Sequence, residues 1–414
     1  MSKNYHSNCY ERSDCRLCGS HNLEIVLSLP PTPPANEFLD KPRNQESYPL
    51  QVMLCMDCGH SQLSHVVNSR ILFDDYLYVS GTSQIFIDHF KEYFKVIEKS
   101  HLLKPNDLIV EIGSNDGTLL MNFSNFRVLG VEPAKKISEI ASESGIPTLN
   151  SYFSPSLAND IVENHGKAKL ILANNVMAHI DNLSDVVRGI KLLLNFDGIF
   201  VMEVQYLGDM LDKGLFDMIY FEHLDYHAVT PLIEFFKKHK LKLFDVTKIP
   251  THGGSIRCFV SHINDESKNE TDAFKFLVQK EAKTELLLPK PWRNLELLIS
   301  TAKKNLTHVL AELKKKNKKI IAYGAPAKLT TLFYTFGLDK KQIDYVVDDS
   351  PLKIGLYTPG THIPILSSSE IYVLQHKPDA ILITAWNFSE SIIAKHGKLK
   401  DVVWITPFPN LIIG

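Results

Sequence analysis

The 414-residue sequence contains no run of apolar residues approaching the roughly 20 that a membrane-spanning helix needs. It also has no excess of charge, since 45 Lys and Arg residues balance 47 Asp and Glu residues, which gives no electrostatic reason to expect nucleic acid as a partner. Residues 1–10 are polar and lack the apolar core of a secretion signal. We therefore expect a cytoplasmic protein without membrane or nucleic-acid partners, either a monomer or a weak homo-oligomer.

Internal repeats of fixed period and low-complexity tracts are also absent, and the length indicates two or three domains. Residues 16–63 are rich in proline and other turn residues, as expected of a small looped unit. A helical pattern follows at about residues 83–101, and the sequence pattern changes after it.

From residue 107 onward, short β-rich runs alternate with helical patterns, which predicts a mostly parallel sheet covered by helices on both faces. Two long helical patterns, at 273–286 and 294–316, lead to a second and smaller α/β sheet. We divide the chain into residues 1–75, 76–265 and 266–414. The predicted strands are 108–112, 128–132, 170–173, 199–203, 242–246 and 255–261 in the first sheet, and 320–323, 343–347, 380–384 and 402–405 in the second.

Four of the six cysteines form two Cys-x-x-Cys pairs, each followed by a glycine. In a reducing compartment such pairs indicate a metal more often than disulfides, although a redox pair or two coincidental turns would have the same spacing. Two pairs supply the four soft ligands that tetrahedral zinc prefers and leave no open coordination position, so we expect a structural zinc ion. The predicted ligands are Cys15, Cys18, Cys55 and Cys58.

A glycine-bearing turn follows the first strand of the central unit, where ligands of open α/β sheets bind. Glu132, at the end of the next strand, can accept hydrogen bonds from both ribose hydroxyls of an adenosine, so a nicotinamide dinucleotide and S-adenosylmethionine are rival cofactors. The dinucleotide fingerprint has a glycine where Asn115 stands, and the acid Glu111 suits a cationic sulfonium ligand better than a pyrophosphate. The predicted cofactor residues are Glu111, Gly113, Asn115, Asp116, Glu132, Pro133, Asn174 and Asn175.

A phenol, a carboxylate and an imidazole lie close together past the strand at 199–203, in Tyr220, Glu222 and His223. Such a trio can provide a general base, its orienting partner and an oxyanion stabiliser, but it is equally compatible with a surface loop. Two further candidates are His179, at the end of the loop after the third strand, and His252, which opens a His-Gly-Gly stretch.

With these motifs in order, nearly the whole chain resembles the sugar C-methyltransferases that act on nucleotide-linked 4-keto-deoxysugars. Many separate motifs in register are far more specific than any one of them. They are Cys15-x-x-Cys18-Gly19, Cys55-x-x-Cys58-Gly59, Tyr76-Leu77-Tyr78-Val79-Ser80-Gly81, Glu111-Ile112-Gly113-Ser114-Asn115-Asp116-Gly117, Asn174-Asn175-Val176-Met177-Ala178-His179, Tyr220-x-Glu222-His223, His252-Gly253-Gly254, Tyr323-Gly324-Ala325-x-Ala327-Lys328 and Pro359-Gly360-Thr361-His362-Ile363-Pro364.

The resemblance implies an α/β protein with a small N-terminal zinc-binding module, a central Rossmann-like class I methyltransferase domain and a C-terminal Rossmann-like α/β domain that holds the nucleotide. It implies S-adenosylmethionine as the cofactor and a nucleotide-linked 4-keto-sugar as the substrate. The catalytic residues that it implies are His223 as general base, with Tyr220, Glu222, His179 and either Tyr76 or Tyr78 around the sugar.

This chemistry suits the residue types. A ketone at C-4 acidifies the hydrogen on the neighbouring carbon, so a neutral imidazole can remove it if a phenol or imidazolium stabilises the enolate oxygen. The carbanion then attacks the methyl group of the cofactor, and the step requires no metal. Whether that carbon is C-3 or C-5 stays open, as do the nucleotide and the sugar.

In the third unit, a glycine loop lies between a strand and a helix, so backbone amides at the helix start can meet a diphosphate while Lys328 adds positive charge. A glycine turn with a solvated lysine is the alternative. Leu329 and Leu356 depart from the family pattern, which usually has a small residue and a basic residue there, and this leaves the nucleotide or sugar in doubt. The candidates for substrate binding are His252, Gly324, Ala325, Lys328 and Asp348.

Two other functions fit the sequence. An O- or N-methyltransferase on the same scaffold would not need an acidic carbon, and a zinc-bearing binding protein would carry an inactive core. The cluster around His223 argues against the second of these.

Overall fold

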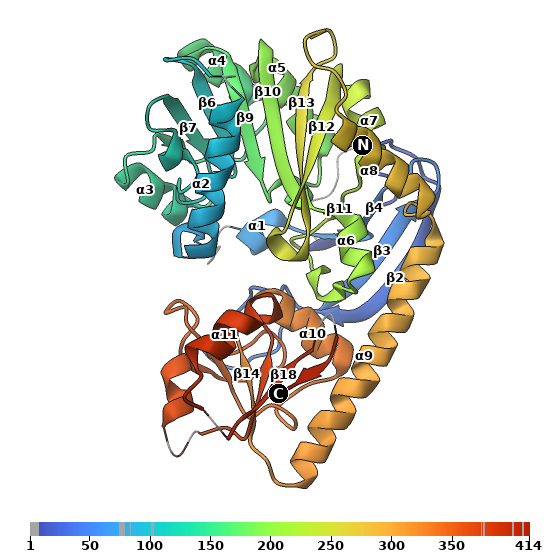
Figure 1. Ribbon diagram of the computed structural model, residues 1–414, viewed down its shortest axis with the longest axis vertical. Helices are drawn as coiled ribbons and strands as arrows, with labels where there is room; N and C mark the ends of the chain where they lie inside the picture. The colour runs from blue at the N-terminus through green and yellow to red at the C-terminus, as the bar shows by residue number, and fades with distance from the viewer. Residues whose placement is uncertain are drawn as a thin grey trace.

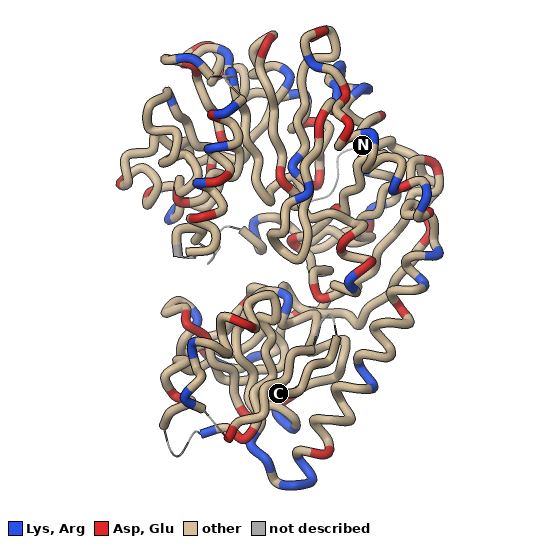
Figure 2. The backbone as a smooth tube through the Cα atoms, in the orientation of Figure 1, with Lys and Arg blue, Asp and Glu red and all other residues tan. Residues whose placement is uncertain are grey.

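The computed structural model describes residues 8–73, 79–82, 84–100, 103–373, 375, 377–399, 401–407 and 410–414. Two α/β units, each built on one sheet, lie one above the other, and the long helix α9 (Pro289–Lys315) joins them along one side (Figure 1). Acidic and basic residues are interspersed over both, with a short basic run where α9 ends (Figure 2). No helix within these ranges is long and apolar enough to cross a bilayer.

The central sheet has seven strands in the order β12-β13-β10-β9-β6-β7-β8. The strands from β10 to β8 pair in parallel, whereas β13 pairs antiparallel with both β10 and β12. All six strands predicted for this unit are present, and the short β8 is added at one edge. The bounds are β6 (Leu108–Ile112), β7 (Arg127–Val131), β8 (Thr148–Leu149), β9 (Ala168–Asn174), β10 (Leu194–Gln205), β12 (Leu241–Ile249) and β13 (Ser255–His262).

Helices cover both faces of this sheet, which explains why its central strands read as continuous apolar runs. Successive side chains of a strand point to opposite faces. Ile109 and Leu170 therefore pack with Tyr93 of α2, whereas Val110 and Ile171 belong to the core on the other face. The main helices of this unit are α2 (Gln84–Lys99), α3 (Lys135–Glu143), α4 (Pro155–His165), α5 (Leu183–Leu193) and α7 (Val229–Lys238). Helix α8 (Asp272–Lys283) lies beyond the boundary expected at residue 265 but packs against β12 and α7 of this unit.

The N-terminal unit is a four-stranded antiparallel sheet in the order β11-β4-β3-β2. Its edge strand β11 (Asp225–Tyr226) comes from the central part of the chain, directly after the predicted reactive cluster. The sequence did not predict this pairing, so the N-terminal and central units share a sheet. The other strands are β2 (Leu23–Thr32), β3 (Tyr48–Cys55) and β4 (Ser61–Leu63), beside a separate pair formed by β1 (Cys9–Glu11) and β5 (His65–Val67).

The C-terminal sheet has the order β16-β15-β14-β17-β18-β19, and its strands are parallel except for β19. The strand expected at 343–347 begins only at Val346, because pairing with both neighbours starts there. A bridge between Leu39 and Tyr357 attaches the N-terminal unit to this one. The bounds are β14 (Ile320–Tyr323), β15 (Val346–Asp348), β16 (Ile365–Ser367), β17 (Ala380–Ile383), β18 (Val403–Thr406) and β19 (Ile412–Ile413), with helices α10 (Lys328–Phe336) and α11 (Ser389–Lys395).

Short helices connect these elements, and several of them carry residues of the cavity described below. They are α1 (Ser69–Phe73), α6 (Leu207–Asp212) and the 3-10 turns Ser80–Thr82, Leu120–Phe123, Met177–His179, Phe216–Met218, Thr251–Gly253, Ser368–Tyr372 and Trp386–Phe388.

A buried carboxylate fastens α8 to the start of α7. Glu281 accepts hydrogen bonds from the backbone amides of Val229 (2.7 Å) and Thr230 (2.8 Å), which have no partner within the helix. The Glu281→Ala variant leaves these amides unpaired, so we expect its free energy of unfolding in urea to fall by about 2–3 kcal/mol. The exposed Glu296 is a control on α9: Glu296→Ala should change this energy by less than about 0.5 kcal/mol, and equal losses would contradict the role of Glu281.

Candidate active site

One large cavity, of about 900 Å3, lies where the three units meet. The N-terminal unit contributes Asn36 and Phe73, the central unit contributes Gly113 and the reactive segment, and the C-terminal unit contributes Lys328 and Lys353. The cavity is therefore complete only when all three units are folded.

The turn after β6 shapes one side of the cavity. Gly113 (φ +67°) and Asn115 (φ +50°) have left-handed backbone conformations, which glycine and asparagine adopt most readily. The Glu132 carboxylate accepts hydrogen bonds from the backbone amides of Asn115 (3.0 Å) and Ala134 (2.9 Å). Glu132 thus fixes the turn and still offers lone pairs to the cavity that it lines.

Of the predicted cofactor residues, two lie behind the wall of the cavity. Asp116 accepts a hydrogen bond from the backbone amide of Gly81 (2.9 Å) and so holds the neighbouring segment. Glu111 is 3% exposed, and the side-chain amide of Asn174 donates a hydrogen bond to it (3.2 Å). The residues that line the cavity are Gly113, Asn115, Glu132, Pro133, Asn174 and Asn175.

The environment of Glu111 fits a positively charged cofactor. Burial raises the pKa of this carboxyl well above its ordinary value. Its second oxygen has no hydrogen-bond partner among the described residues. A buried acceptor of this kind favours a cationic or donor group beside the turn, and S-adenosylmethionine carries a sulfonium and an ammonium group.

Replacing Gly113 by alanine should weaken cofactor binding. An added Cβ would lie 2.8 Å from the side chain of Val176, and the left-handed backbone costs an L-residue about 1–2 kcal/mol. We expect the dissociation constant of S-adenosylmethionine, measured by calorimetry, to rise about tenfold or more. Gly145→Ala is the matched control, because Gly145 has φ +88° but nothing within 4 Å of an added Cβ. Equal affinity in the two variants would show that the turn does not hold the cofactor.

The reactive segment presents an imidazole in one defined tautomer. His223 Nδ1 donates a hydrogen bond to the backbone carbonyl of Met218 (2.8 Å). Its Nε2 is then unprotonated and accepts a hydrogen bond from the Tyr220 hydroxyl (3.0 Å). The His179 ring stacks on the His223 ring with the centroids 5.2 Å apart. His223 Nε2 therefore carries the basic lone pair, which the Tyr220 hydroxyl engages, and both residues line the cavity.

Burial shifts the pKa values of these groups toward their uncharged forms. It lowers the pKa of His223 to about 4, and His252 adds to this shift. It also lowers the pKa of His179 well below its ordinary value. Glu222 accepts a hydrogen bond from the side-chain amide of Asn36 (2.9 Å), and burial raises the pKa of its carboxyl to about 7. At neutral pH the cluster therefore contains neutral imidazoles and a carboxyl close to its titration midpoint.

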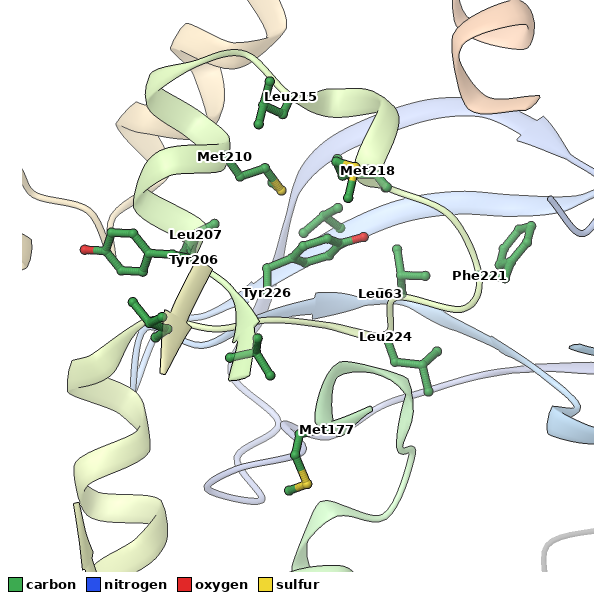
Figure 3. Close-up of a cluster of buried hydrophobic side chains, with 14 of the residues drawn as sticks. Leu63, Met177, Tyr206, Leu207, Met210, Leu215, Met218, Phe221, Leu224 and Tyr226 are labelled. Carbon is green, nitrogen blue, oxygen red and sulfur yellow. The ribbon is translucent and has the colours of Figure 1, made fainter. Parts of the chain in front are cut away.

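Apolar side chains anchor the reactive segment from behind. Leu215, Met218, Phe221, Leu224 and Tyr226 point into a buried cluster that also includes residues of α6 and β4 (Figure 3). Between them, Tyr220, Glu222 and His223 line the cavity, together with atoms of Met218 and Leu224.

Lys328 forms the wall that the C-terminal unit contributes. Its Nζ donates a hydrogen bond to the side chain of Asn387 (2.8 Å) and lies 3.6 Å from the ring centre of Trp386. Burial lowers the pKa of Lys328 to about 8. Lys353 lines the same wall and donates a hydrogen bond to the Ala325 carbonyl (2.8 Å). Two amines thus meet the cavity on the side opposite the cofactor turn.

The other predicted substrate residues are divided between the cavity and the loop behind it. His252 lines the cavity with its backbone in the left-handed region (φ +54°). Asp348 accepts hydrogen bonds from the amides of Ala325 (2.6 Å) and Ser350 (2.7 Å), and Gly324 has φ +95°. These three residues, Gly324, Ala325 and Asp348, shape the loop that presents Lys328. Tyr76 and Tyr78 lie outside the described residues.

The four cysteines predicted as zinc ligands come together in the N-terminal unit. Their sulfur atoms all lie within 4.8 Å of one another. The Sγ atoms of Cys15 and Cys58, and those of Cys18 and Cys55, are 3.6 Å apart. Tetrahedral zinc with Zn–S bonds of about 2.3 Å places its sulfur ligands about 3.8 Å apart, so the cluster fits this metal.

Several residues of the cavity were not predicted from the sequence. Asn36 and Lys353 had no local signal, since each lies in a turn-rich stretch far from the motif that it contacts. Asn387 follows the strand predicted at 380–384. The rule that ligands bind beyond the carboxyl ends of strands could have identified it.

Three family descriptions match the chain in order: a zinc binding domain at residues 15–73, a methyltransferase domain at 87–244 and a C-methyltransferase C-terminal domain at 250–409. The C-methyltransferase NovU of Streptomyces niveus is 30% identical over 404 residues, which cover 96% of each chain. The chain belongs to the sugar C-methyltransferase family. It is therefore an S-adenosylmethionine-dependent C-methyltransferase with a zinc-binding module, as the sequence predicted.

Solved structures add only distant similarities. Magnesium protoporphyrin IX methyltransferase from Synechocystis PCC 6803 is 12% identical and has a TM-score of 0.32, with 43% of this chain and 79% of that chain covered. An S-adenosylmethionine-dependent methyltransferase from Clostridium acetobutylicum is also 12% identical and has a TM-score of 0.34, with 44% and 92% covered. Similarities this low support no inference about the site of this enzyme.

Proposed function

We propose that this enzyme methylates a carbon next to the C-4 ketone of a nucleotide-linked deoxysugar, with His223 as the general base. The observation that carries this proposal is the tautomer of His223. Its Nδ1 hydrogen is held by the Met218 carbonyl, so Nε2 is the basic nitrogen of a residue that lines the cavity. O-methylation and N-methylation act on heteroatoms and have no need of a buried base for a carbon acid.

In the proposed reaction, His223 Nε2 takes the proton from the carbon beside the ketone. The pKa of about 4 describes the free enzyme, in which an imidazolium would be buried without a counter-charge. The negative charge that develops on the substrate supplies this counter-charge, so the imidazolium becomes favourable as the enolate forms. The Met218 carbonyl keeps the Nδ1 hydrogen in place throughout.

The enolate oxygen needs a donor, and two neighbours of His223 can supply one. The Tyr220 hydroxyl, which donates to Nε2 in the free enzyme, can turn to the substrate oxygen when the substrate binds, which frees the Nε2 lone pair for the proton. Glu222, with a pKa of about 7, carries a proton in a large fraction of molecules at neutral pH and can donate it in a hydrogen bond. The enolate carbon would then accept the methyl group as the methyl–sulfur bond of the sulfonium breaks, which would leave a neutral thioether, and the proton on His223 would pass to water after the product leaves.

The two remaining sides of the cavity would hold the cofactor and the nucleotide. Gly113, Glu132 and Asn174 would hold S-adenosylmethionine, which supplies an electrophilic methyl group when bound. Lys328 and Lys353 would meet the diphosphate of the substrate, because both amines line the opposite wall and phosphate oxygens favour such donors.

The test uses the wild-type enzyme in deuterated water with a panel of nucleotide 4-keto-sugars, followed by mass spectrometry and NMR. We expect deuterium to replace hydrogen beside the ketone without cofactor, and a methyl group to appear on that carbon with it. The position of exchange distinguishes C-3 from C-5. A mass gain of one methyl group without loss of a carbon-bound hydrogen would indicate O- or N-methylation and would overturn the proposal.

A further inference from the structure

The first turn of α10 is bonded directly to the backbone that holds His223. The Thr331 hydroxyl donates a hydrogen bond to the Ile219 carbonyl (2.7 Å). Ile219 follows Met218, whose carbonyl fixes the tautomer of His223. The C-terminal unit therefore contacts the catalytic segment one residue away from the group that orients the base.

The same helical turn also reaches the residue that holds Glu222. The Thr330 hydroxyl donates a hydrogen bond to the carbonyl of Ala35 (3.2 Å). Asn36 is the next residue and donates its own hydrogen bond to Glu222. One turn of α10 is thus attached to the supports of two groups in the reactive cluster.

A buried acid connects this turn to the catalytic segment through charge. Asp217 is fully buried, and one of its oxygens accepts a hydrogen bond from Trp386 Nε1 (2.5 Å). Its other oxygen has no hydrogen-bond partner among the described residues. Lys328, the first residue of α10, lies over the ring of the same tryptophan. Asp217 directly precedes Met218, so Trp386 contacts both the amine and the residue next to the one that orients His223.

We propose that Asp217 is a positioning residue that couples the binding of an anionic substrate group at Lys328 to the orientation of His223. The coupling rests on the proposed function, in which Lys328 meets a diphosphate and His223 is the base.

The charges around Lys328 provide the physical reason. The titratable groups that act on this amine are Asp217 and His252. Burial disfavours the charged amine, and Asp217 opposes that effect. When an anion binds at Lys328, the positive charge of the amine interacts with that anion as well as with the Asp217 carboxylate. The contacts that link the amine to the catalytic segment run through Trp386, whose ring lies beside Lys328 Nζ and whose Nε1 donates a hydrogen bond to Asp217, the residue before Met218.

The experiment follows the ring nitrogens of His223 by NMR in full-length protein labelled with 15N-histidine. The signals are assigned by their absence in the His223→Asn variant. Thymidine diphosphate and uridine diphosphate are added separately to the wild type and to Asp217→Asn, which keeps an acceptor for Trp386 but removes the charge. We expect at least one diphosphate to shift the His223 signals of the wild type, and the shift to be at least about twofold smaller in Asp217→Asn.

Kinetics supply the second readout. The kcat of solvent exchange should fall about tenfold or more in Asp217→Asn, with a smaller change in KM, because a misplaced base slows the chemical step more than it weakens binding. Thr331→Val removes the hydrogen bond from the Thr331 hydroxyl to the Ile219 carbonyl and should also lower kcat. Thr335→Val on the same helix is the matched control, because the Thr335 hydroxyl is buried without a partner among the described residues.

Two outcomes would overturn the coupling: a full-sized shift in Asp217→Asn, or a wild type in which neither diphosphate moves the His223 signals. An equal loss of kcat in Thr331→Val and Thr335→Val would show that the hydrogen bond from α10 to Ile219 does not position the base. Failure of the proposed function is distinct, since it would appear as solvent exchange that persists in His223→Asn.

Discussion

The His223→Asn variant is expected to lose methyl transfer by about 10²- to 10⁴-fold in kcat, the range typical for removal of a general base. Asparagine can still donate a hydrogen bond to the Met218 carbonyl, so the segment should keep its shape while the basic Nε2 is lost. The rate is measured at saturating S-adenosylmethionine. The exposed His308 on α9 is the control, and His308→Asn should leave kcat unchanged. A variant at position 223 that retains wild-type kcat would exclude an imidazole base.

The pH dependence of the wild-type enzyme is a second test of the role of His223. His223 acts as a base only when it is neutral, and burial lowers its pKa to about 4. The imidazole of the free enzyme is therefore neutral throughout the range from pH 6 to pH 8, and protonation of His223 should reduce kcat/KM only as the pH falls toward 4. An acid limb that centres near the ordinary histidine value of about 6.5 would show that His223 is not held in its buried, neutral state.

Removal of zinc is expected to unfold the N-terminal unit and abolish activity. Zinc binding contributes about 10–16 kcal/mol in zinc-binding peptides near neutral pH, which exceeds what the packing of so small a unit supplies. Because this unit pairs with β11, directly after His223, the cavity should lose its shape with the metal. Dialysis against a chelator and the Cys55→Ser variant should both lower the metal content, the Tm and kcat.

Cys9 offers a control for the zinc experiment, since it lies in β1 outside the four-cysteine cluster. Cys9→Ser should keep its zinc and its activity. Metal-free protein with an unchanged Tm and kcat would show that the cysteines contribute nothing to the fold.

Local sequence patterns predicted the parts of the site whose conformation depends on residues that are neighbours in the sequence. The buried strand before Gly113 and the left-handed turn after it depend on neighbouring residues, so their types are visible in the sequence. The paired cysteines and the segment from Tyr220 to His223 were visible for the same reason.

The parts that were not predicted depend on contacts between distant segments. The pairing of β11 with β4 joins residues more than 160 positions apart. A strand of two residues is too short to show the alternating pattern from which strands are predicted. Asp217 is an isolated acid in an apolar stretch, and its partner Trp386 belongs to another unit. Glu111 and Asp116, which flank the glycine turn, do not line the cavity themselves but bond to Asn174 and Gly81, and their contact with the cofactor stays a prediction.

The shared sheet formed by β2, β3, β4 and β11 has a consequence for recombining enzymes of this family. A chimaera that exchanges only the N-terminal unit must rebuild the pairing of β4 with β11, which begins two residues after His223. A chimaera that exchanges only residues 76–265 carries β11 away from its partner strand. Productive crossovers should therefore keep residues 61–63 and 225–226 from the same parent, and also Trp292 of α9, whose ring packs edge-on against Tyr226 of β11 with the ring centroids 6.1 Å apart.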